Sequence, residues 1–301
     1  MGPIAVAYAV AGDIKVSHSI FALPFALFGA FLAASWPHII EWPRFLGQLV
    51  LIVAAMVIAR TIAMIANRLL DRRIDDANPR TQGRALPSGR LSPEQATSAL
   101  LVCVGLFFSV TSAFAILWGN VWPVLLSLPV LAWLMAYPLL KRHSFCCHLW
   151  LGISLAISPL AAAIAIDPLS LTAVPALWLL AVMVACWVAG FDVIYALQDV
   201  EIDRAQGLYS LPAILGIRCA IWVSRGLHLI AVMALLLVWK TEAALGTPFL
   251  IAIVATAVLL IWEHATVATW GTTKVAMAFF TLNGVIAIVL GVTGIIEIAA
   301  Q

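Results

Sequence analysis

Charged side chains are scarce in this sequence. Only 10% of the 301 residues are charged, against about 25% in soluble domains, while 64% are hydrophobic and the mean hydropathy is +1.09. A membrane-spanning helix needs about 20 mostly apolar residues, and such segments recur along almost the whole chain. This composition excludes a soluble globular protein, and we expect one integral membrane domain over residues 1–301.

Three further absences exclude other classes. The net charge is only +2 and no run rich in Lys and Arg with interleaved aromatic residues is present, so nucleic-acid binding is not expected. The five cysteines form neither a disulfide framework nor a zinc-binding pattern. No basic region precedes the first apolar stretch, which Asp13 and Lys15 interrupt, so a cleaved signal peptide is not predicted. No obligate protein partner is evident.

The sequence predicts an all-α protein with nine transmembrane helices. Each is an apolar segment bounded by charged residues, by Gly or Pro, or by Trp residues at the membrane interface. They lie near residues 17–35, 45–69, 93–118, 121–139, 147–166, 173–198, 217–239, 248–269 and 275–298. The third helix has the best-defined start, because Ser92, Pro93 and Gln95 form a capping-box pattern with Pro at the first helical position.

Basic residues are distributed unequally between the two sets of connections. If the N-terminus is cytoplasmic, the opposite side receives only Arg44 and Lys240. The cytoplasmic side then holds Arg68, Arg72, Arg73, Arg80, Arg84, Arg90, Lys141, Arg142, Arg204, Arg218 and Lys274. Because positive charge is retained on the cytoplasmic side, this orientation is predicted.

An acidic motif lies at the end of the second predicted helix. Asn67, Asp71 and Asp75 are four residues apart. Positions i, i+4 and i+8 spread over only about 80° of helix circumference, so the three side chains are expected on one face. Arg60, seven residues before Asn67, lies on that face and within the span.

A second acidic motif lies at the end of the sixth predicted helix. Asp199 and Asp203 are again four residues apart, and Asp192 precedes Asp199 by seven. Four helices separate the motifs, so both emerge on the same side of the membrane. Paired carboxylate clusters favour Mg²⁺, which is usually shared between one or two carboxylates and substrate phosphates. Candidates to bind the remaining phosphate charge are Arg68, Arg72, Arg80, Arg84 and Lys141.

An alternative interpretation is a solvated rim of charges at the cytoplasmic face. Two motifs of matching spacing and sidedness disfavour it. Arg60 and Asp192 also argue against it, because ionised groups within spans are costly and mark functional sites. These two residues could instead pair with one another.

The two acidic motifs resemble those of the UbiA superfamily of membrane prenyltransferases. The first is Asn67-x-x-x-Asp71-x-x-x-Asp75, followed by Arg80-Thr81-Gln82-Gly83-Arg84, and the second runs from Tyr195 to Asp203. Weaker similarity to the 4-hydroxybenzoate polyprenyltransferases and their menaquinone-pathway relatives lies in Ile14–Phe25, Tyr137–Arg142 and Phe279–Asn283. In one departure, Tyr209 stands where many relatives carry Lys or His.

The resemblance implies a single bundle of nine transmembrane helices around a central cavity. It further implies that Mg²⁺, bound by Asn67, Asp71, Asp75, Asp199 and Asp203, grips the diphosphate of an allylic polyprenyl donor. The polyprenyl chain would pass to an aromatic acid such as 4-hydroxybenzoate in ubiquinone or menaquinone biosynthesis.

Three residues receive roles beside the diphosphate. Arg60 is the first candidate to bind the acceptor carboxylate, Asp192 to accept its proton, and Tyr195 to contact substrate. We expect the site to face the cytoplasm from a bacterial inner membrane. The alternatives left open are a UbiA-type enzyme with a naphthoate, haem or chlorophyll-type acceptor, and a membrane transporter.

Overall fold

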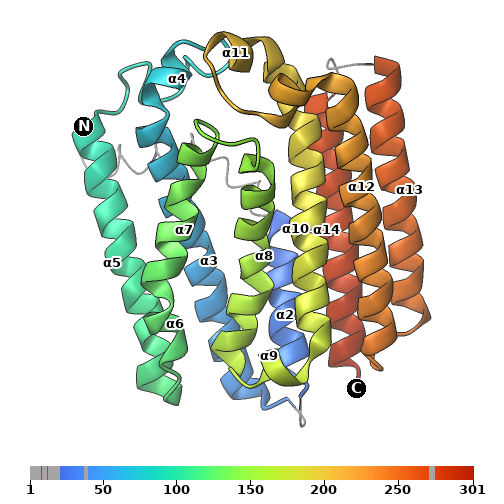
Figure 1. Cartoon of the computed structure of the whole chain (residues 1–301). Helices are drawn as coiled ribbons and strands as arrows, with labels where there is room; N and C mark the ends of the chain where they lie inside the picture. Colours follow the sequence, from blue (N-terminus) through green and yellow to red (C-terminus); the bar gives the residue numbers. More distant parts are fainter. Residues whose placement is uncertain (1–7, 9–11, 13–20, 37–39, 271–274) are drawn as a thin grey trace.

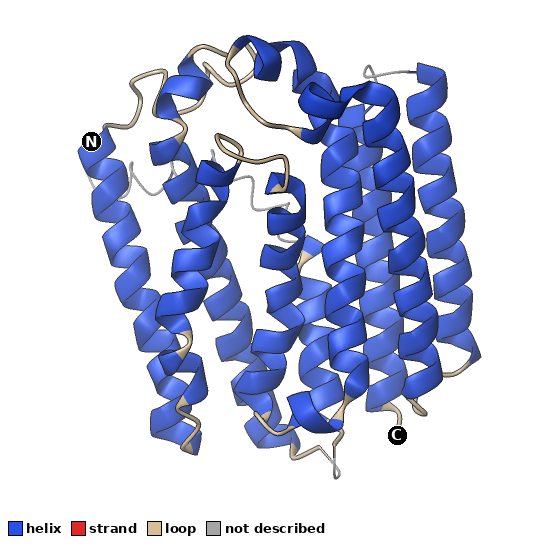
Figure 2. Cartoon of the chain, in the orientation of Figure 1, coloured by secondary structure: helices blue, strands red, loops and turns tan. Residues whose placement is uncertain are grey.

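The fold consists of helices that run between the two ends of a bundle (Figure 1). The computed structural model describes Tyr8, Gly12 and residues 21–36, 40–270 and 275–301. Across these residues every regular element is a helix and no strand occurs (Figure 2). The helices are α2 (Leu23–Ala34), α3 (Trp42–Leu70), α4 (Arg72–Asp76), α5 (Pro93–Trp118), α6 (Trp122–Leu125), α7 (Ser127–Leu140), α8 (Cys147–Ile166), α9 (Ser170–Ala173), α10 (Pro175–Ala196), the 3-10 turn η2 (Leu197–Asp199), α11 (Val200–Ala205), α12 (Leu211–Thr241), α13 (Thr247–Trp270) and α14 (Val275–Ala299).

Seven helices of the described chain are long and apolar enough to cross a membrane. They correspond to seven of the nine predicted spans. The other two, near 17–35 and 121–139, correspond to the shorter apolar helices α2 and α7. The all-α prediction is therefore confirmed, whereas nine spanning helices are not. Residues 17–20 of the first predicted span, and the predicted cytoplasmic Lys274, lie outside the described residues.

A proline divides the fourth predicted helix. The structure has a break at Leu126, between α6 and α7. Pro129 has no N–H to donate to the carbonyl of Leu125, and its ring crowds that carbonyl. The continuous helix predicted for 121–139 was therefore wrong.

The predicted cap of α5 is confirmed. The Gln95 backbone N–H donates to Ser92 Oγ at 3.2 Å, and the Ser92 backbone N–H donates to Gln95 Oε1 at 3.1 Å. Pro93 occupies the first helical position. These reciprocal bonds satisfy two of the free amides at the helix N-terminus.

Helix α10 is the most buried of the spans and packs between α8 and α12. Its Trp187 is fully buried and meets Phe25 of α2 edge to face, with ring centroids 5.4 Å apart. Gly152 of α8 approaches α10 so closely that a Cβ atom there would clash with the Ala185 carbonyl oxygen. Small residues allow such close approach of helices in membranes. Because α10 leads into the second acidic motif, this packing anchors that motif.

Both acidic motifs lie at one end of the bundle. Helices α4 and α11, which carry them, are neighbours at the upper end in Figure 1, and α9 lies at the opposite end. The prediction that the two motifs emerge on the same side is confirmed.

Candidate functional site

The first acidic motif bends at its first aspartate. Helix α3 ends at Leu70, Asp71 has φ −91° and ψ 8°, and α4 follows. Backbone bonds from Asp71 N–H to the Asn67 carbonyl (2.9 Å) and from Asp75 N–H to the Asp71 carbonyl (2.8 Å) keep the one-turn spacing. Asn67 Nδ2 donates to Asp71 Oδ2 at 3.1 Å. The predicted spacing and the end of the second helix are therefore kept, although the bend at Asp71 interrupts the helical geometry assumed for the motif.

The second motif bends in the same way. Helix α10 passes through η2, and Asp199 has φ −107° and ψ 7° before α11 begins. Both bends fall in the bridge region of backbone space, where many active-site residues lie. Asp199 and Asp203 are buried, with 8% and 2% exposure. Buried carboxylates require compensating charges or ligands.

Arg80 joins the two motifs across 119 positions of sequence. Its Nε and Nη2 donate to the two carboxylate oxygens of Asp199 at 3.2 and 2.7 Å, a bidentate pair, and its Nη1 donates to the Tyr195 hydroxyl at 3.3 Å. Burial is the largest single influence on the pKa of Arg80 and lowers it, but the charge and hydrogen bond of Asp199, with smaller contributions from Tyr195 and Asp75, together raise the net pKa. The guanidinium therefore stays charged beside the motif.

Two consecutive basic residues after α7 reach one motif each. Lys141 Nζ lies 2.7 Å from Asp203 Oδ1, and Arg142 Nη2 lies 3.0 Å from Asp71 Oδ1. Burial raises the pKa of Asp71, and Arg142 opposes that rise. The backbone N–H of Tyr209 donates to the Lys141 carbonyl at 2.8 Å. Position 209 therefore helps to hold the Lys141 backbone in place whatever its side chain. Arg142 was missing from the predicted site, although its place beside Lys141 was a signal.

Asp75 is neutralised by basic residues of its own segment. Arg84 Nη1 donates to its two carboxylate oxygens at 2.7 and 2.8 Å, and Arg68 Nη1 lies 4.0 Å from Oδ2. Arg68 also donates to Asn67 Oδ1 at 2.6 Å. Arg72 is exposed on α4, and no ion pair of the described residues includes it. Four of the five predicted phosphate-binding cations thus lie among the aspartates.

The donor set fits a divalent cation that is shared with phosphate. No three His, Cys, Asp or Glu side chains in the described part of the chain converge as a closed metal site. Asp203 Oδ2 is buried and has no hydrogen-bond partner, so one carboxylate oxygen remains available. Mg²⁺ commonly takes one or two carboxylates and completes its shell with water and phosphate oxygens. The predicted five-residue ligand set is not gathered into one cluster, but its oxygens suit this shared arrangement.

Asp192 pairs with a histidine that the sequence analysis missed. Its Oδ2 lies 2.7 Å from His148 Nδ1, and the Leu211 backbone N–H donates to His148 Nε2 at 3.2 Å. Because Nε2 accepts, the ring proton belongs on Nδ1, where it donates to the carboxylate. Arg60 lies half-buried on α3. No local sequence pattern indicates His148 as a site residue, because it reaches Asp192 from a different helix, α8.

A second polar group within the spans was also not predicted as a unit. Trp187 Nε1 donates to Asn283 Oδ1 at 2.8 Å, and Asn283 Nδ2 donates to Glu263 Oε1 at 2.8 Å. Asn283 is fully buried, and both ends of its amide are hydrogen-bonded to neighbouring helices. Beside them, His228 Nδ1 and His264 Nε2 lie 3.1 Å apart. Of the similar segment Ile14–Phe25, residues 14–20 lie outside the described residues.

Known proteins share this arrangement of helices. The profile of the UbiA prenyltransferase family matches residues 1–285. A 4-hydroxybenzoate octaprenyltransferase from Aliivibrio fischeri (strain ATCC 700601 / ES114) is 29% identical over 238 residues, 76% of this chain and 79% of that protein. A UbiA homologue from Aeropyrum pernix K1 superposes with a TM-score of 0.80 at 31% identity, covering 94% of this chain and 98% of that one. An Archaeoglobus fulgidus UbiA homologue bound to GPP and Mg²⁺ has a TM-score of 0.67 at 17% identity, covering 97% and 100%, which shows a common fold.

Proposed function

We propose, from the premise that this chain belongs to the UbiA prenyltransferase family, that it transfers a polyprenyl group from an allylic polyprenyl diphosphate to an aromatic acid such as 4-hydroxybenzoate. The observation that carries the proposal is the assembly of four aspartates and their basic partners at one end of the bundle. The curated relatives named 4-hydroxybenzoate octaprenyltransferase support this acceptor and a long prenyl chain. The family assignment favours an enzyme over the transporter alternative.

The aspartates would bind the Mg²⁺ that accompanies the diphosphate of the donor. Asp71, Asp75, Asp199 and Asp203, with Asn67 assisting, supply the oxygen ligands that Mg²⁺ prefers. When bound, Mg²⁺ supplies positive charge that stabilises the leaving diphosphate.

The basic residues would bind the diphosphate itself. Arg80, Arg84 and Lys141 already contact carboxylates at 2.7 Å, and their long side chains can turn to phosphate oxygens once the donor arrives. The guanidinium groups suit bidentate binding and Lys141 acts as a point charge. These charges lie where negative charge develops as the allylic carbon–oxygen bond breaks, and so they lower the barrier.

The acceptor would lie deeper in the bundle. Arg60 is ten residues before the end of α3, about 15 Å along the helix axis, and could pair with the aromatic carboxylate. The ring carbon ortho to the phenol attacks the allylic carbon, the bonding pair of the broken bond leaves on diphosphate, and the ring then loses its proton. The Asp192 carboxylate, oriented by His148, is the proposed acceptor of that proton.

We further propose quinone biosynthesis at a bacterial inner membrane as the setting, with the acidic end facing the cytoplasm. The bacterial relatives and the excess of Lys and Arg at the acidic end support this orientation. The apolar prenyl tail would remain in lipid while the diphosphate stays at the polar end.

Product formation tests the function directly. Protein in lipid nanodiscs is incubated with octaprenyl diphosphate, 4-hydroxybenzoate and Mg²⁺, and mass spectrometry detects the prenylated acid while released diphosphate is counted. We expect one diphosphate per product and loss of both when EDTA is added. The matched variants are Asp75→Asn, which removes a buried carboxylate, and Asp76→Asn, which changes the exposed neighbour. Equal activity of the two variants, or turnover in EDTA, would contradict the metal-and-aspartate mechanism.

Acceptor choice needs a competition experiment. With 4-hydroxybenzoate and 1,4-dihydroxy-2-naphthoate present together, we expect the benzoate product to dominate. A dominant naphthoate product would reassign the acceptor while leaving prenyl transfer intact.

A further inference from the structure

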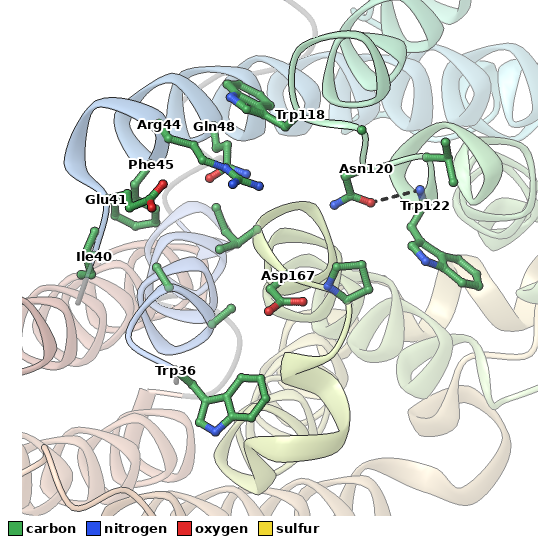
Figure 3. Close-up of a pocket in the computed structure, with 16 residues that line it drawn as sticks. Trp36, Ile40, Glu41, Arg44, Phe45, Gln48, Trp118, Asn120, Trp122 and Asp167 are labelled. Atoms are coloured by element: carbon green, nitrogen blue, oxygen red, sulfur yellow. Dashed lines mark hydrogen bonds between the residues drawn. The ribbon is translucent and has the colours of Figure 1, made fainter. Parts of the chain in front are cut away.

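A pocket lies at the end of the bundle opposite the acidic motifs, where α6 and α9 are seen in Figure 1. Figure 3 shows the residues that line it. It has a volume of about 560 Å³ and is formed where α2, α5 and α8 end and α3 and α6 begin. Helix α3 runs from this pocket to Asp71, and its 29 residues span about 43 Å. The pocket is thus separated from the prenyl-transfer site by the thickness of a bilayer.

Tryptophans place the pocket at the level of lipid headgroups. Trp36, Trp118 and Trp122 line it, and Trp36 and Trp122 are 36% and 49% exposed. Trp side chains concentrate at membrane–water interfaces, where the ring is apolar and its N–H is solvated. The ligand that reaches this pocket most readily is therefore a lipid of that leaflet.

Three charged residues line the pocket, Glu41, Arg44 and Asp167, and they form no ion pair with one another. Arg44 and Glu41 are exposed, and the described residues offer neither side chain an ion pair or side-chain hydrogen bond. Asp167 Oδ1 accepts the Leu169 backbone N–H at 2.9 Å, and within the described part of the chain no ion pair involves this carboxylate. In Figure 3 the guanidinium of Arg44 and the carboxylate of Asp167 point into the pocket from different walls. The pocket therefore presents one positive and two negative groups.

The neutral polar residues of the pocket are already engaged. Asn120 Nδ2 donates to the carbonyls of Ile164 and Ala165 at 2.8 and 3.2 Å, and the Trp122 backbone N–H donates to Asn120 Oδ1. Gln48 Nε2 donates to the Ala165 carbonyl at 3.4 Å. These bonds hold the end of α8 against α3 and the end of α5. The neutral polar side chains therefore fix the shape of the pocket, and the charged side chains are left to bind a ligand.

The partial charges at two helix ends also favour a ligand that carries one negative and one positive group. Arg44 lies in the first turn of α3, beside the positive end of that helix, and Asp167 caps the C-terminus of α8, beside its negative end. Arg44 and Asp167 thus each lie next to a helix end of the same sign, whereas Glu41 is the N-cap residue of α3. A ligand with an anion at Arg44 and a cation at Asp167 relieves both repulsions.

We propose that this pocket binds the headgroup of a zwitterionic phospholipid with a primary ammonium group. The phosphate lies at Arg44 and the ammonium lies at Asp167, with Glu41 as the second carboxylate of the pocket. Exposed Leu46 and Val50, on the following turns of α3, provide an apolar path for an acyl chain. The pattern selects against a purely anionic headgroup, which lacks a cation for Asp167. It also disfavours a quaternary ammonium, which has no N–H to donate.

Competition between lipids tests the proposal. Delipidated protein in detergent is mixed with equal amounts of phosphatidylethanolamine, phosphatidylcholine and phosphatidylglycerol that carry identical acyl chains, and native mass spectrometry measures the bound lipids. We expect phosphatidylethanolamine to be retained most and phosphatidylglycerol least. Charge-assisted contacts predict that Arg44→Gln weakens phosphatidylethanolamine binding about tenfold or more, and that Asp167→Asn narrows its preference over phosphatidylcholine.

The matched control is Lys240→Gln, which removes the other basic residue predicted on this side of the membrane, itself exposed at the end of α12. It should leave binding of all three lipids unchanged. Equal retention of the three lipids by the unaltered protein overturns the proposal, as does equal loss in Lys240→Gln and Arg44→Gln. If Arg44→Gln does not fold, Asp167→Asn decides alone: an unchanged lipid preference in that variant overturns the assignment. Prenyl transfer enters none of these measurements, so failure here is distinct from failure of the proposed enzyme activity.

Discussion

His148 is expected to stabilise the bundle and to keep Asp192 in place, and its replacement by leucine removes two hydrogen bonds at once. The ring donates to Asp192 from Nδ1 and accepts the Leu211 backbone N–H at Nε2. That amide lies in the first turn of α12, where four N–H groups have no partner within the helix. Ser210, the residue at the N-cap, makes no side-chain cap bond, so His148 caps α12 in its place.

The expected loss of unfolding free energy in His148→Leu follows from the burial of the two side chains. The side chains of His148 and Asp192 are 5% and 16% exposed. A hydrogen bond to a charged group contributes about 1.5–3 kcal/mol, and a buried amide left without a partner costs about 1–3 kcal/mol. Water can reach part of Asp192, so we expect His148→Leu to lower the free energy of unfolding by about 3 kcal/mol, near the lower end of the sum.

The assay is reversible unfolding in mixed micelles, combined with steady-state kinetics. His148→Gln keeps a donor and an acceptor on one side chain and should recover most of the stability and turnover. His143→Leu, which changes an exposed histidine of the preceding connection, should have no effect on either. A double-mutant cycle with Asp192→Asn should give a coupling energy of about 1.5–3 kcal/mol.

Two results would refute this reasoning. Unfolding free energies of His148→Leu and His143→Leu within 0.5 kcal/mol of one another, about the scatter of surface substitutions, would show that the buried bonds contribute nothing. A coupling energy near zero would show that the ring and the carboxylate act independently.

Three other predictions concern the proposed reaction and orientation. Asp71→Ala and Asp199→Ala should each abolish turnover while circular dichroism in detergent stays unchanged, and near-normal activity of either would contradict the two-motif site. Arg60→Ala should raise the acceptor KM by about one to two orders of magnitude, because a charge-assisted pair is worth about 1.5–3 kcal/mol; a raised donor KM beside an unchanged acceptor KM would reassign Arg60 to the diphosphate. In a cysteine-free background, cysteines placed at Arg84 and Lys141 should react with impermeant thiol reagents only from the cytoplasmic side, whereas periplasmic labelling of both would reverse the orientation.

Sequence reasoning succeeded where the cause is local. The apolar spans follow from composition over about 20 residues. The cap of α5 depends on residues within one turn, and Ser92 and Gln95 form it as predicted. The start predicted at 217 coincides with a kink at Gly216, whose φ of 81° is readily available to glycine. Failures of local reasoning were also local, since Pro129 was present in the sequence and its effect on the fourth helix was overlooked.

The composition and the two acidic motifs were sufficient to predict a membrane protein with its aspartates at one end of the bundle, because helix periodicity and charge placement act over short stretches of chain. The partners of those aspartates were decided only by tertiary structure. Arg80 reaches Asp199, Arg142 reaches Asp71 and His148 reaches Asp192, each from another segment of the chain. The helices bring these side chains together through packing over their whole length, as where Gly152 lets α8 approach α10. Any of several basic residues could have served each carboxylate by spacing alone, and only the positions of the packed helices select among them.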